Sequence, residues 1–216
     1  MNIASYLDHT LLKAQSTLKE IDTLCEEARR LNVAAVCINP LYVERAVSRL
    51  KGSRVKVATV VGFPLGATLS SVKAREAHDA IVVGAEEIDM VMSIGQFLSG
   101  EIKVVARDIR EVVLAAGALP VKVIIETCYL SPKQIAQASL IACDEGAAFV
   151  KTSTGFGTRG ATIDDVRLIR AAVGERCLIK ASGGIRTYEQ AMAMIDAGVA
   201  RIGTSSSADI VAGEKR

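Results

Sequence analysis

Two lysines and one aspartate end or interrupt apolar runs of the chain, and these residue types in these positions could do chemistry. Lys151 ends the run Ala-Ala-Phe-Val-Lys, Lys180 ends Cys-Leu-Ile-Lys, and Asp89 lies inside Glu-Ile-Asp-Met-Val-Met. If the two lysine-bearing runs are neighbouring strands, each positive charge favours the neutral form of the other, and an apolar setting adds to this effect. A neutral amine attacks an aldehyde to form an imine, whose protonated form withdraws electrons from the adjacent carbon–carbon bond. The three residues therefore predict a Schiff-base reaction on Lys151 that cleaves or forms a carbon–carbon bond.

Each of these residues also has a simpler interpretation. A lysine at the end of a strand commonly reaches solvent, and an aspartate within a strand can be a structural carboxylate bound to the backbone or to an arginine. A buried, unpaired anion is costly, however, so Asp89 is expected to meet a cation, a polar network or water. A lysine amine is its natural partner, which favours one site that contains Lys151, Lys180 and Asp89.

Histidine is too scarce for most metal-dependent or histidine-assisted mechanisms. The chain contains only His9 and His78. A multi-histidine metal site is therefore not available, and a Ser/His or Cys/His pair is not favoured. We expect neither a metal nor a cofactor.

Two glycine-containing segments near the end of the chain could bind a phosphate group. Gly183-Gly184 follows the run that ends at Lys180, and Gly203-Thr204-Ser205 follows the last apolar run. Such segments expose backbone N–H groups, and a helix that starts after Gly203 would add the positive end of its dipole. Glycine and serine are also ordinary turn residues, so the alternative is that these segments only reverse the chain.

The segment from Gly155 to Gly160 matches the dinucleotide-binding pattern G-x-G-x-x-G, and Glu175 follows about 20 residues after the first glycine. The motif does not open a βαβ unit near the start of a domain, however, and Thr-Ser-Thr separates it from the preceding strand. A loop over the substrate is the favoured interpretation, and a nicotinamide site is the alternative.

The candidate residues must be positioned by secondary structure, and strand-like and helix-like segments alternate along the chain. Short apolar runs are separated by longer segments with apolar residues at helical spacing. The predicted strands are 33–38, 55–63, 87–92, 121–126, 147–151, 177–180 and 199–203, with a weaker extended segment at 6–9.

Helix boundaries are well marked. Three helices are predicted to begin at a hydroxyl residue followed three positions later by an acid or amide: Thr17 with Glu20, Ser131 with Gln134, and Thr187 with Gln190. Three helices are predicted to end at a glycine just before a strand. These glycines are Gly146, Gly174 and Gly198.

The strands are apolar on both faces, which is typical of parallel strands covered by helices. Eight such strands in 216 residues predict a closed (β/α)₈ TIM barrel, with residues 1–216 forming a single domain. An open, doubly wound sheet is the alternative, because periodicity alone does not show closure. In a barrel the active site lies at the carboxyl ends of the strands, where Lys151 and Lys180 are predicted to lie.

Composition excludes several classes of function. The net charge is +2 without a basic run, so a nucleic-acid partner is not expected. The longest charge-free stretch, 57–72, is too short and too broken by Gly62, Pro64 and Gly66 for a membrane span. The first residues do not resemble a secretory signal, and five widely spaced cysteines are expected to be reduced. We expect a soluble, cytoplasmic protein with no membrane partner.

Several segments in the right order resemble the deoxyribose-phosphate aldolase family. They include Phe-Val-Lys151-Thr-Ser-Thr-Gly-Phe, Ile-Lys180-Ala-Ser-Gly-Gly-Ile-Arg and Glu-Ile-Asp89-Met-Val, together with segments 6–12, 36–40 and 61–66. The likeness spans nearly the whole chain. It implies a class I aldolase that cleaves 2-deoxy-D-ribose 5-phosphate reversibly to D-glyceraldehyde 3-phosphate and acetaldehyde.

The resemblance also implies roles for individual residues. Lys151 would form the imine with C1 of the sugar, while Asp89, acting with Lys180 and a water, would move the protons. Asp8 would lie near the site beside Cys37, a thiol that can react with aldehyde products. The residues that would bind the substrate and its phosphate are Thr152, Gly183, Gly184, Gly203, Thr204 and Ser205.

Two departures from the family pattern bear on the substrate end of the site. Phe156 stands where some members have a lysine, and the chain lacks a terminal tyrosine. The resemblance implies a homodimer, or a tetramer, acting on a small phosphorylated aldose. The alternatives are a Schiff-base aldolase for another sugar phosphate, and a phosphate-binding barrel without catalytic activity in which Lys151 only contacts the phosphate.

Overall fold

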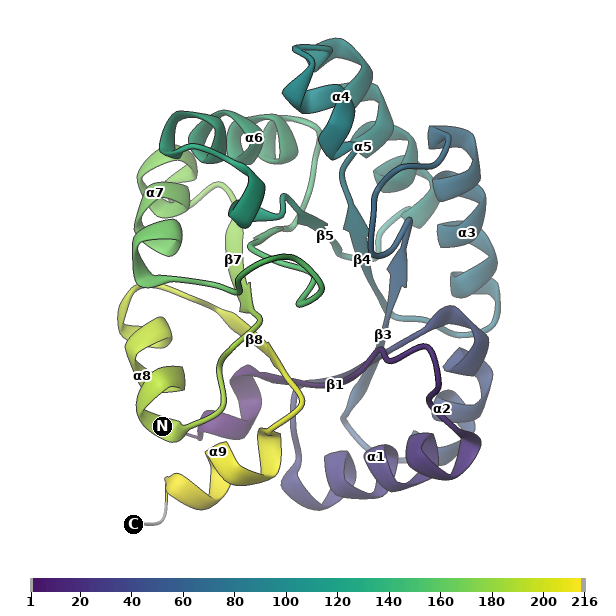
Figure 1. Ribbon diagram of the computed structural model, residues 1–216. Helices are drawn as coiled ribbons and strands as arrows, with labels where there is room; N and C mark the ends of the chain where they lie inside the picture. Colours follow the sequence, from purple (N-terminus) through teal and green to yellow (C-terminus); the bar gives the residue numbers. More distant parts are fainter. Residues whose placement is uncertain (1, 215–216) are drawn as a thin grey trace.

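The computed structural model describes residues 2–214, and its centre is a closed barrel of eight parallel strands (Figure 1). Closure is made by β1 and β8, where Leu7 lies opposite Ile202 and Asp8 lies opposite Gly203. The predicted barrel is therefore confirmed, and the open sheet is wrong. The strands are β1 (Leu7–Leu11), β2 (Ala35–Ile38), β3 (Lys56–Val61), β4 (Glu87–Val91), β5 (Val121–Ile124), β6 (Phe149–Lys151), β7 (Leu178–Ser182) and β8 (Arg201–Thr204).

Each predicted strand occurs, but several of their ends differ from the apolar runs. Val33 and Val55 are buried residues of the segments that lead into β2 and β3 rather than members of those strands. The run 121–126 was too long, because Glu126 has a φ of 53°, a left-handed conformation that cannot continue a strand. Burial extends beyond the hydrogen-bonded ladder, so apolarity alone overestimates strand length.

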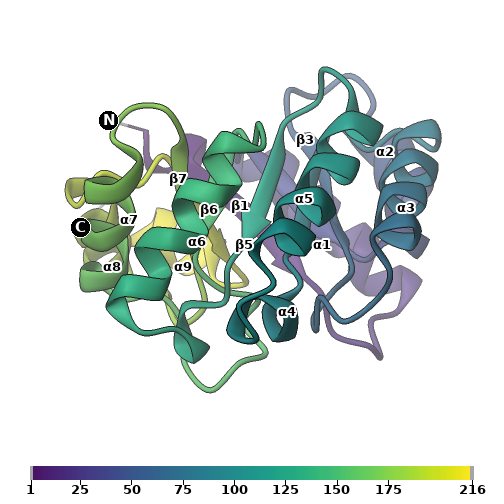
Figure 2. The ribbon, with the colours of Figure 1, turned by 90° about the horizontal axis from the view of Figure 1, so that it is seen from above.

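The helices surround the barrel as an outer ring (Figure 1), and Figure 2 shows the same ribbon turned by 90° about the horizontal axis. They are α1 (Leu18–Leu31), α2 (Val43–Leu50), α3 (Ser70–Val82), α4 (Ile94–Leu98), α5 (Ile102–Ala116), α6 (Pro132–Asp144), α7 (Ile163–Val173), α8 (Tyr188–Asp196) and α9 (Ser207–Gly213), with short 3₁₀ helices at Ile3–Tyr6, Pro40–Tyr42 and Thr127–Tyr129. No helix within 2–214 is both long and apolar enough to cross a bilayer.

The predicted helix starts are confirmed by their capping hydrogen bonds. Thr17, Ser131 and Thr187 each form a reciprocal capping box with the acid or amide three positions later. A fourth capping box, formed by Thr162 and Asp165 at the start of α7, was missed. Because Asp165 is also an acceptor for neighbouring side chains, this cap ties α7 to the loop that follows β6.

The two faces of the barrel wall have different chemistry. The outer face packs against the helices in one large core of valine, isoleucine, leucine and alanine side chains. Inside the barrel, β2 and β3 contribute only small or apolar side chains, namely Ala35, Cys37, Ala58 and Val60. Buried charged side chains come instead from β1 and from β4 to β7, and β8 adds the partly buried Arg201. The barrel interior therefore has an apolar side and a charged side, and the candidate residues lie on the charged side.

Candidate active site

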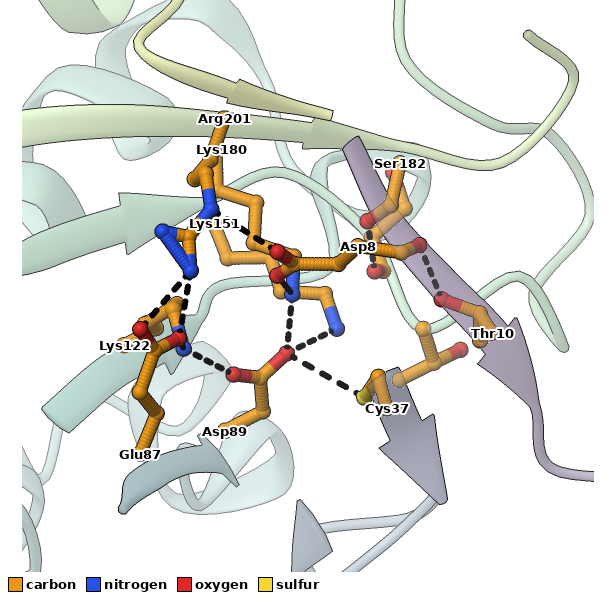
Figure 3. Close-up of polar contacts among 12 residues, drawn as sticks. Asp8, Thr10, Cys37, Glu87, Asp89, Lys122, Lys151, Lys180, Ser182 and Arg201 are labelled. Carbon is orange, nitrogen blue, oxygen red and sulfur yellow. Dashed lines mark hydrogen bonds and ion pairs between the residues drawn. The ribbon is translucent and has the colours of Figure 1, made fainter. Parts of the chain in front are cut away.

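The barrel brings Lys151, Lys180 and Asp89 together (Figure 3). Lys151 ends β6 and lies directly opposite Lys180 on β7 in the strand register. Both amines donate to the same oxygen of Asp89: each Nζ lies 2.7 Å from Asp89 Oδ2. All three side chains are almost completely buried. Both lysines that were expected to lie beside Asp89 therefore contact it.

A third lysine, Lys122 on β5, also binds Asp89. Its Nζ lies 2.9 Å from Asp89 Oδ1 and 2.6 Å from Glu87 Oε2. Sequence reasoning missed Lys122, although it interrupts the apolar run of β5 just as Asp89 interrupts that of β4. A charged residue inside an apolar strand was the signal that could have found it.

Arg201 on β8 joins the ion-pair network by contacting both Asp8 and Glu87. Arg201 Nε lies 2.8 Å from Asp8 Oδ1, and Arg201 Nη2 lies 2.7 Å from Glu87 Oε1. Asp8 in turn accepts a hydrogen bond from Lys180. Asp8 thus lies at the site, as the family resemblance implied, and its contacts link β1 to β7 and β8 across the point where the barrel closes.

The carboxylates of this network are held in their charged form. Burial by itself raises the pKa of Asp89, but the three surrounding lysine amines bring that pKa well below its usual value. Burial also raises the pKa of Asp8, and the charges of Lys180 and Arg201 outweigh this effect and lower it. Asp89 is therefore an anion that accepts hydrogen bonds.

Lys180 is held in its charged form as well. Burial by itself lowers the pKa of Lys180, but the carboxylates of Asp8 and Asp89 raise it above its ordinary value. The pKa of Lys122 is raised for the same reason, chiefly by Asp89. The expectation that the lysine pair would favour the neutral form of both amines is therefore wrong for Lys180. A carboxylate in direct contact has a stronger effect than a neighbouring amine.

A cavity of about 390 Å³ lies at the carboxyl end of the barrel, next to Lys151. Five of the six residues expected to bind substrate or phosphate line it, namely Gly183, Gly184, Gly203, Thr204 and Ser205. Thr152 does not line the cavity. Its hydroxyl accepts a hydrogen bond from the backbone N–H of Ser182 at 3.1 Å, so it joins the ends of β6 and β7.

Cys37 lies on β2 beside Asp89, with its sulfur 3.8 Å from Asp89 Oδ2. Burial, together with the charge of Asp89, raises the pKa of the Cys37 thiol to about 11. A protonated thiol is a weak nucleophile. The position next to the site agrees with the resemblance, and burial beside Asp89 keeps the thiol protonated.

The loop after β6 lies over the barrel opening, where Figure 1 shows it in green. Its glycines meet other parts of the protein closely: a Cβ on Gly160 would lie 2.1 Å from the carbonyl oxygen of Gly183, and one on Gly157 would lie 2.6 Å from Cys128 Sγ. Phe156 packs edge-to-face on Phe63, with 5.3 Å between ring centroids. Close packing within the chain accounts for Gly157 and Gly160 without a dinucleotide.

Two cations at the cavity were missed by sequence reasoning. Lys13 follows β1 and Arg186 follows β7, and both line the cavity together with Lys151. No aspartate or glutamate is among the described residues that line it. Over the same part of the chain, no three His, Cys, Asp or Glu side chains are grouped so that they could hold a metal ion.

Comparisons with known proteins agree with this geometry. The family model of DeoC/LacD family aldolases matches residues 2–210. The deoxyribose-phosphate aldolase of Deinococcus radiodurans is 54% identical over 213 residues, which cover 99% of this chain and 97% of that protein. An aldolase called QR15 superposes with a TM-score of 0.94 at 41% identity, covering 97% and 94% of the two chains. The tetrameric deoxyribose phosphate aldolase of Aeropyrum pernix has a TM-score of 0.91 at 31% identity, covering 99% and 91%.

Proposed function

The chain belongs to the DeoC/LacD family of aldolases and has deoxyribose-phosphate aldolase activity, and we propose that Lys151 forms the Schiff base of this reaction. The enzyme cleaves 2-deoxy-D-ribose 5-phosphate reversibly into D-glyceraldehyde 3-phosphate and acetaldehyde. The site contains three buried lysines, so the structure must distinguish the nucleophile from the other two. The charge balance of the ion-pair network supports Lys151 over Lys122 and Lys180.

The network of buried ion pairs contains three carboxylates and four basic side chains. They are Asp8, Glu87, Asp89, Lys122, Lys151, Lys180 and Arg201. With every group ionised, the network would carry one excess positive charge, and an uncompensated buried charge is costly. One amine is therefore favoured to release its proton.

The number of carboxylate partners supports Lys151 as that amine. Lys122, Lys180 and Arg201 each contact two carboxylates of the network, whereas Lys151 contacts only Asp89. Lys151 therefore has the fewest carboxylate contacts of the three lysines, and it is the one of the three that borders the cavity. This single observation supports Lys151 as the nucleophile and Lys180 as the amine that stays protonated.

The reaction can be followed through these groups. The neutral amine of Lys151 attacks C1 of the open-chain sugar, and loss of water leaves a protonated imine. Removal of the proton from the C3 hydroxyl then breaks the C2–C3 bond, and the bonding electrons pass to the imine to form an enamine. Protonation of the enamine at C2 and hydrolysis release acetaldehyde and restore the amine. Asp89 accepts protons and Lys180 supplies them, through the shared hydrogen bonds at Asp89 Oδ2.

The phosphate end of the substrate would lie over the loops that follow β7 and β8. Gly183, Gly184 and the segment Gly203–Ser205 line the cavity there, and Arg186 adds a guanidinium that can bind phosphate oxygens. Thr152 takes part indirectly, by holding the end of β7 against β6.

Borohydride reduction tests the proposed nucleophile. In the presence of 2-deoxy-D-ribose 5-phosphate, borohydride is expected to reduce the imine and leave a stable adduct on the peptide that contains Lys151, because the imine carbon is covalently attached to its Nζ. Mass spectrometry of the digested protein locates the adduct. The matched control is Lys151→Met, which keeps the length of the side chain and should give none. An adduct on Lys122 or Lys180, or none in the active wild-type enzyme, would contradict the proposal.

The oligomeric state is proposed to be a homodimer, with a tetramer as the alternative. Leu65, Leu69 and Val72 are exposed by 72%, 71% and 48% in one short segment before and within α3, and clusters of exposed apolar side chains commonly mark interfaces. Sedimentation velocity should show a species of twice the mass of one chain, and Leu69→Asp should shift it toward one chain. Sedimentation of the wild type as a single chain would contradict the dimer.

The protein is proposed to act in the cytoplasm. All five cysteines are free thiols, and Cys25, Cys37 and Cys177 are buried. Free thiols of this kind persist in a reducing compartment. Its substrate and one of its products are also phosphorylated metabolites, which supports the same location.

A further inference from the structure

We propose that Lys13 binds the phosphate of the substrate from the side opposite Arg186, and that it sets the preference of the enzyme for phosphorylated over unphosphorylated sugars. The inference rests on the proposed function. Lys13 would be a specificity-determining residue on the β1 side of the cavity. On that side, neither the glycine segments nor the Schiff-base network provides a positive charge for the phosphate of the substrate.

The order of the strands places Lys13 and Arg186 on either side of the β8 loop. In the barrel, β8 lies between β7 and β1, as Figure 1 shows. Arg186 follows β7, the segment Gly203–Ser205 ends β8, and Lys13 follows β1, and all three line one cavity. A phosphate bound over the β8 loop would therefore have one cation on each side.

Both cations are free to bind an anion while their backbones are held in place. The charge of Lys13 acts on the exposed carboxylate of Glu20, but among residues 2–214 neither the Lys13 amine nor the Arg186 guanidinium forms a hydrogen bond or an ion pair. The carbonyl of Lys13 accepts hydrogen bonds from the N–H and hydroxyl of Ser16, at 3.1 and 2.8 Å. The backbone N–H of Arg186 donates to Gln190 Oε1 at 2.8 Å. Both side chains are exposed to the solvent that a ligand would displace.

The charge of the cavity matches a phosphate monoester. Such a group carries between one and two negative charges near neutral pH, and the described lining residues include no carboxylate to repel it. The loop over the opening contributes the ring of Phe156 and no amine. Positive charge for the phosphate must therefore come from the β7 and β1 sides, and Lys13 is the cation on the β1 side.

Steady-state kinetics with two substrates test the proposal. Lys13→Gln keeps a polar side chain and removes the charge. It is expected to raise the KM for 2-deoxy-D-ribose 5-phosphate about tenfold, the size expected for a charge-assisted contact that solvent partly screens. The ratio of kcat/KM for the phosphorylated sugar over 2-deoxy-D-ribose should fall by a similar factor. Inorganic phosphate should inhibit the variant about tenfold more weakly than the wild type.

Two control variants make the result specific. Lys13→Arg keeps the charge and should stay within about threefold of the wild-type KM. Lys19→Gln removes the same charge from an exposed position that does not line the cavity, and it should leave the substrate ratio unchanged. Because attraction between exposed charges is screened by salt, the effect of Lys13→Gln should shrink at high ionic strength.

The outcomes separate this proposal from the proposed function. An active wild-type enzyme, combined with an unchanged substrate ratio and phosphate inhibition in Lys13→Gln, overturns the role of Lys13 alone. A wild-type enzyme that shows no activity toward 2-deoxy-D-ribose 5-phosphate overturns the proposed function instead. If Lys19→Gln changes the ratio as much as Lys13→Gln, the effect is one of overall charge, and the specific contact is wrong.

Discussion

Replacing Lys180 by methionine is expected to lower kcat/KM at neutral pH by roughly a thousandfold, within the usual range for loss of a general acid, and to move the activity profile to higher pH. Without Lys180, the three carboxylates of the network are balanced only if Lys151 is protonated. A protonated amine cannot attack an aldehyde. Raising the pH removes that proton, so part of the activity should return under alkaline conditions.

The measurement is the pH dependence of kcat/KM, together with that of borohydride trapping. Lys180→Arg is the matched control, because it keeps the positive charge between Asp8 and Asp89. It should keep the wild-type pH profile even if its geometry lowers the rate. Wild-type activity with an unshifted profile in Lys180→Met would remove Lys180 from the mechanism.

Replacing Asp89 by asparagine is expected to reduce both activity and stability. The amide leaves the amines of Lys122, Lys151 and Lys180 without their common carboxylate. Removal of one partner from a buried ion pair typically costs about 3 to 5 kcal/mol, and loss of the proton acceptor should lower kcat by roughly a thousandfold. Denaturant unfolding and steady-state kinetics measure the two effects.

A second substitution separates charge balance from catalysis. The double variant Asp89→Asn with Lys122→Met removes one carboxylate and one amine, so the network regains the charge of the wild type. It should recover a large part of the lost stability but none of the lost activity. Equal stability of the single variant and the wild type would show that Asp89 does not hold the network together.

The family assignment also decides between the alternatives considered for Lys151. A phosphate-binding barrel without catalytic activity is not supported, because the whole chain matches the aldolase family. The same match favours 2-deoxy-D-ribose 5-phosphate as the substrate over another sugar phosphate. The absence of a lysine at Phe156 does not leave the phosphate without a cation, because Lys13 and Arg186 line the cavity.

The local pattern of the sequence was sufficient to predict the alternating strands and helices and the central part of the site, whereas closure of the barrel is shown by the pairing of β1 with β8. Apolar runs, capping residues and closing glycines predict strands and helices because they depend on neighbours within a few positions. Parallel strands place their carboxyl ends at one end of the barrel, so Lys151 and Lys180 could be expected to meet. Asp89 could be expected beside them because a buried anion requires a cation.

Tertiary structure alone decided what surrounds these residues. Asp8 and Lys180 are 172 positions apart and meet only because β1 closes on β8. That contact, made across the barrel, raises the pKa of Lys180, whereas the sequence pattern had indicated the opposite. The electrostatic energy of a buried group depends on every charge within a few ångströms, and spacing along one strand does not reveal those on other strands. For this reason the sequence was enough to predict that two lysines and an aspartate meet, while the closed barrel decided which carboxylates each lysine contacts.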